Sequence, residues 1–177
     1  MTESVFGLHY DGRKTVLLKR LAEPAPGRIQ LLTGPRQVGK TTLLLELAKE
    51  FGEAAHFVAM DEPQAGLPGF WERTWNDAEQ RASGGPAVLF VDEIQKVSDW
   101  PARIKGNYDR IKRRKTPLHI VASGSSALGL RAGSRESLAG RFERLTLVRF
   151  FPSTYPRSGK PWRNASSRAS IPGRGDK

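Results

Sequence analysis

One short stretch of the sequence has the residue types and the spacing needed to bind nucleotide phosphates. Residues 34–41 read GPRQVGKT and fit the pattern G-x-x-x-x-G-K-[ST]. Glycines let the backbone turn so that several N–H groups converge on an anion. Lys40 then offers an ammonium to the outer phosphates, and Thr41 offers a hydroxyl to Mg2+. The predicted nucleotide contacts are Gly34, Pro35, Arg36, Gln37, Val38, Gly39, Lys40, Thr41 and Thr42.

A second motif with chemical potential is an acid pair that follows an apolar run. Residues 87–91 read AVLFV, and Asp92 and Glu93 come directly after them. An acid at the end of a buried strand is the expected holder of Mg2+, and a glutamate beside it can polarise a water for attack on the terminal phosphate. The alternative is a pair of carboxylates that cap a loop. We predict Thr41 and Asp92 as metal ligands and Glu93 as the catalytic base.

Both motifs need strands and helices to position them, and the apolar pattern predicts these in alternation. Strands are expected over residues 28–33, 54–60, 87–91, 118–122 and 145–150, with a polar turn over 123–126. Helices are expected over residues 14–23, 42–51, 71–82 and 99–114. Such alternation predicts an α/β fold with a parallel sheet covered by helices on both faces. Ligands of such sheets bind at the carboxyl ends of the strands, where both motifs lie.

Length and composition predict a soluble domain. The chain has 177 residues, no cysteine and a net charge of +11. Disulfides and thiolate metal sites are therefore excluded. No apolar run approaches the roughly 20 residues of a membrane span, and the first residues lack the pattern of a signal peptide. These features favour the cytoplasm and argue against a membrane partner.

Other phosphate-loop classes lack their signatures in this sequence. We find no Asn/Thr-Lys-x-Asp motif after a later strand, as a GTPase would need, and no Ser-Gly-Gly-Gln motif before the acid pair, as a transporter ATPase would need. Small-molecule kinases do not usually need a glutamate beside the metal-binding acid. An AAA-like ATPase is the class that remains. The choice of ATP over GTP rests on no motif of its own.

Four motifs occur in an order typical of one family. They are GPRQVGKTT (34–42), DEIQK with DWP (92–96 and 99–101), SGSS (123–126) and SLAGRFE (137–143). Over residues 14–149 the chain resembles the prokaryotic AAA-type ATPases that carry a C-terminal domain of unknown function. The resemblance implies a three-layer P-loop NTPase sandwich around a mostly parallel five-stranded sheet of the additional-strand type. It also implies ATP and Mg2+ as cofactors.

The resemblance adds two residues to the catalytic set of Lys40 and Glu93. Ser125 resembles the polar sensor of the terminal phosphate, although a plain Ser/Gly turn also explains it. Arg141 resembles the arginine of the family's Leu-Ala-Gly-Arg motif. It could reach phosphate within the molecule, or act as an arginine finger on a neighbour in a homo-oligomer. A surface ion pair with Glu143 is an equally good interpretation.

The composition divides the chain into three segments. We predict an N-terminal segment with a short helix (1–27), an ATPase core (28–150) and a basic, low-complexity tail (151–177). Residues 152–177 contain six basic residues and one acidic residue, and they are too poor in apolar residues to form a core. The tail is either a genuine segment that binds an acidic partner or the truncated or frameshifted end of a longer ATPase. Composition favours the second interpretation.

Two functions remain open from the sequence. The first is Mg2+-dependent ATP hydrolysis that drives a conformational change. The second is a nucleotide-gated switch that engages DNA or a protein and hydrolyses little ATP. A basic cluster, Arg110 with residues 112–115, allows a nucleic-acid contact. A solvated helix end is favoured there, because no aromatic residues interleave the run.

Overall fold

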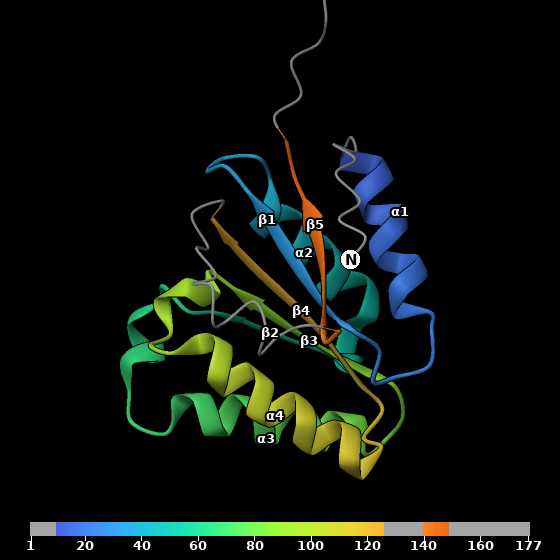
Figure 1. Ribbon diagram of the computed structural model, residues 1–177, viewed down its shortest axis with the longest axis vertical. Coiled ribbons are helices and arrows are strands. Elements are labelled where there is room, and N and C mark those ends of the chain that lie inside the picture. Colours follow the sequence, from blue (N-terminus) through green and yellow to red (C-terminus); the bar gives the residue numbers. More distant parts are fainter. Residues whose placement is uncertain (1–9, 126–139, 149–177) are drawn as a thin grey trace, which may run out of the picture.

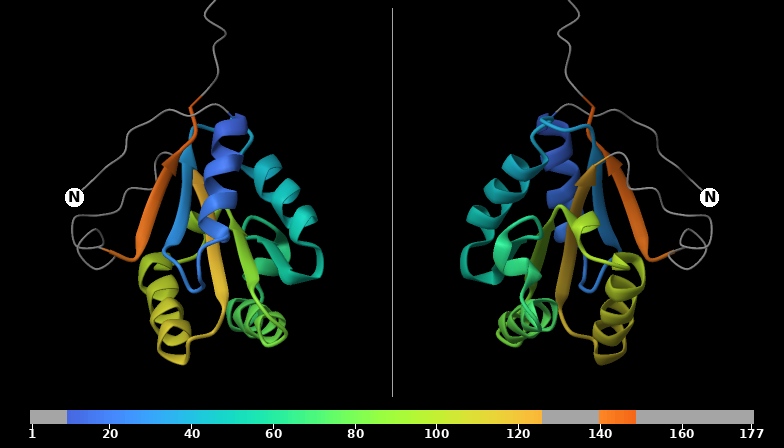
Figure 2. Two further views of the ribbon diagram at one scale, coloured as in Figure 1. Left: turned by 90° about the vertical axis from the view of Figure 1, so that its right-hand side faces the viewer. Right: turned by 90° about the vertical axis from the view of Figure 1, so that its left-hand side faces the viewer.

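The computed structural model describes residues 10–125 and 140–148, which form three layers (Figures 1 and 2). A five-stranded sheet lies between two pairs of helices. In chain order the elements are α1 (Tyr10–Leu21), β1 (Ile29–Gly34), α2 (Lys40–Phe51), β2 (Ala55–Ala59), α3 (Phe70–Ala82), β3 (Ala87–Asp92), α4 (Trp100–Arg114), β4 (Leu118–Ser125) and β5 (Phe142–Thr146). Short 3-10 helices at Gly52–Ala54, Pro63–Gly66 and Ile94–Lys96 lie in the connections.

The strand order is β2-β3-β4-β1-β5, and each pairing of neighbouring strands is parallel. The predicted α/β fold with its five-stranded sheet is therefore confirmed. Because the strands are parallel, their carboxyl ends meet at one edge of the sheet. We call this the carboxyl edge, and the opposite one the amino edge. Strand β4 lies between β1 and β3, so it separates the predicted phosphate loop from the predicted acid pair.

The two faces of the sheet carry separate cores because side chains alternate along each strand. Leu31 and Leu89 face α3 and α4, where Trp75 is fully buried. Leu32 and Phe90 face α1 and α2. The central strands are covered on both sides, which explains why their sequences are continuous apolar runs. Each such large side chain contributes roughly 1.5–3 kcal/mol when it is buried. Trp71, Trp75 and Trp100 all lie in the core on the α3 and α4 side of the sheet.

The fourth strand is longer than the sequence predicted. It runs to Ser125, whereas the polar residues from Ser123 onward were expected to form a turn. The reason is its pairing with β1, which continues through Leu32–Ser123 and Gly34–Ser125. Sheet hydrogen bonding satisfies the backbone there, so the polar side chains do not end the strand. As a consequence, two serines of β4 come to lie at the carboxyl edge.

The first helix and the last strand also begin earlier than predicted. Helix α1 begins at Tyr10 rather than at Lys14. Strand β5 occupies Phe142–Thr146, whereas the apolar pattern pointed to residues 145–150. Its register on β1 starts with the pair Ile29–Phe142. The ring of Phe142 packs against that of Trp100, with the two ring centroids 6.2 Å apart. The predicted tail (151–177), the end of the predicted last strand (149–150) and the last residue of the predicted turn (126) lie outside the described residues.

Candidate nucleotide-binding site

The predicted phosphate loop joins the carboxyl end of β1 to the first turn of α2. Gln37 and Gly39 have φ angles of 61° and 86°, which turn the chain sharply before the helix. Gly39 tolerates this left-handed conformation because it has no Cβ. Its carbonyl oxygen accepts from the Leu43 N–H at 3.0 Å, which begins the helical ladder. The amino end of α2, with its free N–H groups and positive dipole end, therefore lies directly after the loop.

Gly34 is required for a second reason, which the motif alone does not reveal. A Cβ on this residue would lie 2.4 Å from the carbonyl oxygen of Leu147, just after β5. The Leu147 N–H also donates to the Thr33 carbonyl at 2.6 Å. The end of β5 thus lies against the start of the phosphate loop. Any larger residue at position 34 would push these two segments apart.

Lys40 is buried at the base of the loop, with 5% of the residue exposed. Its Nζ donates to the carbonyl oxygens of Gly34, at 3.1 Å, and Pro35, at 2.8 Å. The ammonium is therefore held by the loop's own backbone. Thr41 and Thr42 follow on the first turn of α2, and both are exposed. Pro35, Arg36 and Gln37 are exposed as well.

The acid pair lies at the end of β3. Asp92 is its last residue and is 2% exposed, whereas Glu93 is half-buried with a φ of 52°. The Oδ1 atom of Asp92 accepts from the Glu93 N–H at 3.1 Å and from the Ser123 hydroxyl. The Gln95 side-chain amide donates to Oε2 of Glu93. Among the described residues no basic side chain pairs with either acid.

The two serines of β4 lie between the loop and the acid pair. Ser125 pairs in register with Gly34, so the predicted sensor does lie beside the phosphate loop. Ser123 is completely buried and contacts Asp92. Sequence reasoning missed Ser123 because it assigned the whole SGSS segment to a turn. The available signal was the alternation of the strand, which places residues 123 and 125 on one face.

Arg141 lies apart from the other predicted site residues. It precedes β5 at the amino edge, where its carbonyl accepts from the Ile29 N–H. Gly34 is five residues beyond Ile29 along β1, which corresponds to roughly 17 Å at 3.3–3.4 Å per residue. The predicted ion pair with Glu143 is not formed. Arg141 instead holds Asp109, with Nε–Oδ1 at 2.8 Å and Nη2–Oδ2 at 3.3 Å, and this lowers the pKa of that carboxyl.

Glu143 has different partners because it lies within β5, whereas Arg141 lies in the turn before the strand. Its Oε1 accepts from Arg20 of α1 at 2.7 Å, and its Oε2 accepts from Gln30 at 3.2 Å. Arg141 and Asp109 therefore tie β5 to α4, while Glu143 and Arg20 tie it to α1. Arg141 and Glu143, two residues apart in sequence, thus lie in separate ion pairs.

The donors at the carboxyl edge suit Mg2+ better than a softer metal. They are the carboxylate of Asp92 and the hydroxyl of Thr41, which are hard oxygen ligands. Within residues 10–125 and 140–148 there is no group of three or more His, Cys, Asp or Glu side chains that could hold a metal alone. Mg2+ is commonly held by one or two carboxylates together with substrate phosphates, which matches this sparse set.

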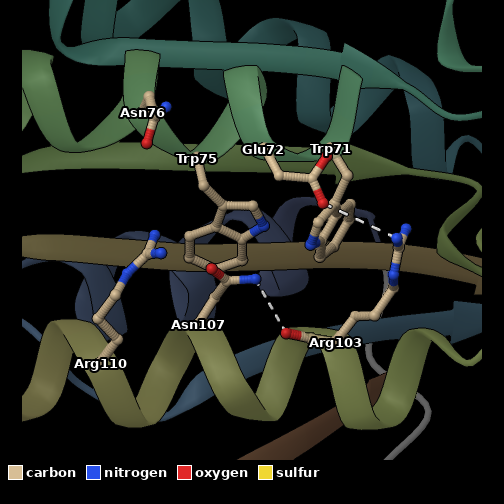
Figure 3. Close-up of a pocket in the computed structure, with 7 residues that line it drawn as sticks. All are labelled: Trp71, Glu72, Trp75, Asn76, Arg103, Asn107 and Arg110. Atoms are coloured by element: carbon tan, nitrogen blue, oxygen red, sulfur yellow. Dashed lines mark hydrogen bonds and ion pairs between the residues drawn. The ribbon is translucent and has the colours of Figure 1, made fainter. Parts of the chain in front are cut away.

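A separate hollow of about 480 Å3 lies between α3 and α4 (Figure 3). Trp71 and Trp75 contribute its aromatic side, and Arg103 and Arg110 extend from α4. Arg103 forms an ion pair with Glu72, with Nη2 and Oε1 3.8 Å apart, and Arg110 forms one with Glu79. None of the predicted site residues lines this hollow. The second ion pair of Glu79, with Arg114, partly neutralises the basic cluster that was considered for nucleic acid.

The fold and the carboxyl edge together define a phosphate-loop α/β domain, and comparison with known proteins identifies its family. Residues 26–154 match the family described as AAA domain. The chain therefore belongs to the AAA domain family and is an ATP-binding domain of that type. Among the described residues no helix is long and apolar enough to cross a membrane.

Individual relatives match parts of this chain. ATPase family gene 2 protein homolog B of Mus musculus is 40% identical over 71 residues, which are 38% of this chain and 10% of the mouse protein. An uncharacterized protein of Mycobacterium tuberculosis is 32% identical over 130 residues, which are 73% of this chain and 26% of that protein. The chain thus spans a small part of each relative's length.

A solved structure has a related fold. The structure titled "Structural Basis for Katanin Self-Assembly" superposes with a TM-score of 0.56 at 20% identity. The match covers 84% of this chain and 53% of the katanin chain. At this identity the likeness concerns the fold alone.

Proposed function

We propose that this domain hydrolyses ATP in a Mg2+-dependent reaction and couples hydrolysis to a conformational change. The observation that carries the proposal is the arrangement along the carboxyl edge. A buried lysine follows β1, a buried carboxylate ends β3, and β4 lies between them. A phosphate chain bound at the amino end of α2 would lie between the lysine and the carboxylate.

Each group has a role that its chemistry supports. Lys40 neutralises the outer phosphates, and the backbone N–H groups of residues 36–42 bind their oxygens. Thr41 and Asp92 would hold Mg2+, which neutralises charge on the phosphate oxygens when it is bound. Glu93 orients the attacking water and accepts its proton, and Gln95 fixes one of its oxygens. Ser125 contacts the terminal phosphate from the end of β4.

A thermal melt with and without Mg-ATP tests this site directly. A ligand that binds only the folded state stabilises it by about 2.7 kcal/mol at a hundredfold excess over its dissociation constant. We expect Mg-ATP to raise the melting temperature of the wild type and to have no effect on Lys40→Ala. Lys49→Ala is the matched control, because Lys49 is an exposed lysine on the same helix. An unchanged response of Lys40→Ala to Mg-ATP would contradict the proposal.

We also propose that Arg141 acts on a neighbouring copy of the chain. It lies at the amino edge, roughly 17 Å along the sheet from its own loop, so contact with its own phosphate is disfavoured. The proposal predicts that turnover per chain rises with protein concentration. Lys40→Ala and Arg141→Ala should each be inactive, yet a mixture of the two should regain activity, because one supplies the arginine and the other the site. Full turnover by Arg141→Ala alone would contradict it.

A further inference from the structure

A buried hydroxyl at the carboxyl edge contacts the metal-binding acid itself. Ser123 has none of its surface exposed, and its Oγ donates to Oδ1 of Asp92. The same Oγ accepts from the Glu93 N–H at 3.5 Å. These are the polar contacts of the Ser123 side chain within the described residues. One hydroxyl therefore touches the side chain of the first acid and the backbone of the second.

Strand pairing explains why these groups meet. Val91 of β3 pairs with Ala122 of β4, and Asp92 and Ser123 are the next residues on the two strands. Their side chains project to the same face because the strands run in parallel and in register. Two residues further along, Ser125 lies beside Gly34. Strand β4 thus connects the phosphate loop to the acid pair through its own short side chains.

The two carboxylate oxygens of Asp92 differ in their hydrogen bonds. Oδ1 accepts from both the Ser123 hydroxyl and the Glu93 N–H. Oδ2 takes part in no hydrogen bond with the described residues. A carboxylate held this way cannot rotate freely about its last bond. It therefore presents a fixed oxygen, already oriented, to a cation at the carboxyl edge.

We propose that Ser123 is a positioning residue that sets the affinity of the site for Mg2+ by orienting Asp92. The proposal rests on the proposed function, because it assumes that Asp92 binds Mg2+ with the nucleotide. Groups that hydrogen-bond to metal ligands fix the ligand orientation, and their removal typically costs roughly 10–100-fold in metal affinity. In this proposal the Ser123 hydroxyl does not contact the nucleotide itself. Its loss should therefore weaken binding of the metal and leave metal-free nucleotide binding unchanged.

The test measures melting temperature while MgCl2 is titrated at saturating ATP. The reference and all variants carry Glu93→Gln, so that ATP is not consumed. A parallel series with ATP and EDTA reports nucleotide binding without the metal. Ser123→Ala removes the hydroxyl, and Ser123→Thr keeps it. Thr33→Val is the matched control, because Thr33 is another buried hydroxyl, 3.3 Å from Thr146 and away from the acid pair.

We expect Ser123→Ala to need at least roughly tenfold more Mg2+ to reach half of the metal-dependent rise in melting temperature. Ser123→Thr and Thr33→Val should stay within about threefold of the reference, and the EDTA series should not change. An Mg2+ midpoint for Ser123→Ala within about threefold of the reference would overturn the proposal. So would an equal loss of the response to ATP in EDTA, since that would indicate a purely structural hydroxyl.

A second variant keeps the test decisive if Ser123→Ala does not melt cooperatively. Ser123→Cys has nearly the same shape but a weak S–H donor. We expect its Mg2+ midpoint to lie above that of the reference, and a midpoint equal to the reference would overturn the proposal. A reference protein that responds to neither ATP nor Mg-ATP would instead refute the proposed function. A response to ATP without any further response to Mg2+ would refute only the metal site and this inference with it.

Discussion

The two edges of the sheet hold their charged side chains in opposite ways. At the carboxyl edge Lys40 and Asp92 are buried, and each is held by backbone groups or a hydroxyl rather than by an opposite charge from the described residues. At the amino edge Arg141 pairs with Asp109, and Arg20 pairs with Glu143. These paired groups are partly exposed.

This is the difference that we expect between a ligand site, as proposed for the carboxyl edge, and a structural edge. Burying a charge costs free energy unless it is paired or well hydrogen-bonded. The buried groups at the carboxyl edge are held in place, yet each retains capacity for a further partner of opposite charge. The groups at the amino edge already neutralise each other across α1, β5 and α4. We therefore expect substitutions at the carboxyl edge to change chemistry. Those at the amino edge should change stability by small amounts, apart from Arg141, for which we propose a role on a neighbouring copy.

The largest effect should come from the acid pair. Glu93→Gln should lower the turnover number by roughly 100-fold or above, since general-base catalysis contributes 10²–10⁴-fold. ATP binding should persist, because the amide keeps the shape of the side chain. Steady-state hydrolysis and a thermal melt with Mg-ATP measure the two quantities. Glu143→Gln is the matched control at the amino edge, and we expect it to keep wild-type turnover.

This experiment also separates hydrolysis from a nucleotide-gated switch. If the wild type turns over no ATP, Glu93→Gln has nothing to lose and the switch interpretation gains support. If the Glu93→Gln and Glu143→Gln variants lose turnover to the same extent, the contrast between the two edges does not hold.

The next largest effect concerns Gly34, where the loop approaches β5. Gly34→Ala places a methyl group 2.4 Å from the Leu147 carbonyl oxygen, so one of the two segments must move. Overpacking of this kind costs roughly 1–3 kcal/mol. We expect the free energy of unfolding, measured with urea, to fall by about this amount. Mg-ATP binding should weaken as well, because the loop begins at this residue.

Gly106→Ala provides a control of opposite sign. Gly106 lies within α4, and a Cβ there would meet no atom within 4 Å. Alanine is the better helix former by roughly 0.5–1 kcal/mol, so this variant should be more stable than the wild type. A stability loss in Gly106→Ala equal to that in Gly34→Ala would show that close contact with Leu147 is not the cause.

These two glycines illustrate what the sequence could and could not predict. The loop motif identified Gly34, because phosphate chemistry dictates a fixed local spacing. It did not reveal the contact with Leu147, which depends on how β5 pairs with β1. Local patterns also predicted the helices and the central strands well, because the spacing of apolar residues is itself a local signal. They misplaced β5, since an apolar run at residues 145–150 looked more strand-like than the charged residues that precede it.

The partners of polar residues were harder to predict than the elements that carry them. Ser123 was assigned to a turn, and its contact with Asp92 follows only from the register of β3 and β4. Arg141 was weighed against Glu143, two residues away in sequence. Arg141 lies in the turn before β5 and reaches Asp109 of α4, whereas Glu143 lies within the strand and reaches Arg20 of α1, so sequence proximity was misleading. The roles assigned to these residues and the division of the chain at positions 27 and 150 remain predictions.

A smaller effect is expected at the amino end of β4, where burial lowers the pKa of His119 below its ordinary value of 6.5. Its Nε2 donates to the Glu23 carbonyl at 3.1 Å. The unfolded chain therefore binds a proton more readily than the folded one. Stability is full above pH 6.5 and falls as the pH drops below it, by at most about 1.4 kcal/mol per pH unit for one proton. Burial lowers the pKa of His56 in the same direction.

Urea unfolding between pH 7.5 and 5 measures this dependence. His119→Gln removes the titrating group and keeps an amide that can donate to Glu23. We expect a shallower pH dependence in this variant, with the remainder due to His56 and to the carboxylates. A slope identical to the wild type would mean that the folded state accepts the proton on His119 without cost.

The smallest effect should come from the ion pair of Arg20 and Glu143. Glu143→Gln removes the charge but keeps a side chain of similar shape that can still accept a hydrogen bond from Arg20. Partly exposed pairs of this kind contribute about 0–1 kcal/mol, because solvent and salt screen them. We expect the free energy of unfolding to fall by less than about 1 kcal/mol at low ionic strength, and the difference to shrink in 1 M NaCl. A loss that is larger and independent of salt would mean that the amino edge also holds a charge that the fold cannot leave unpaired, which would remove the contrast with the carboxyl edge.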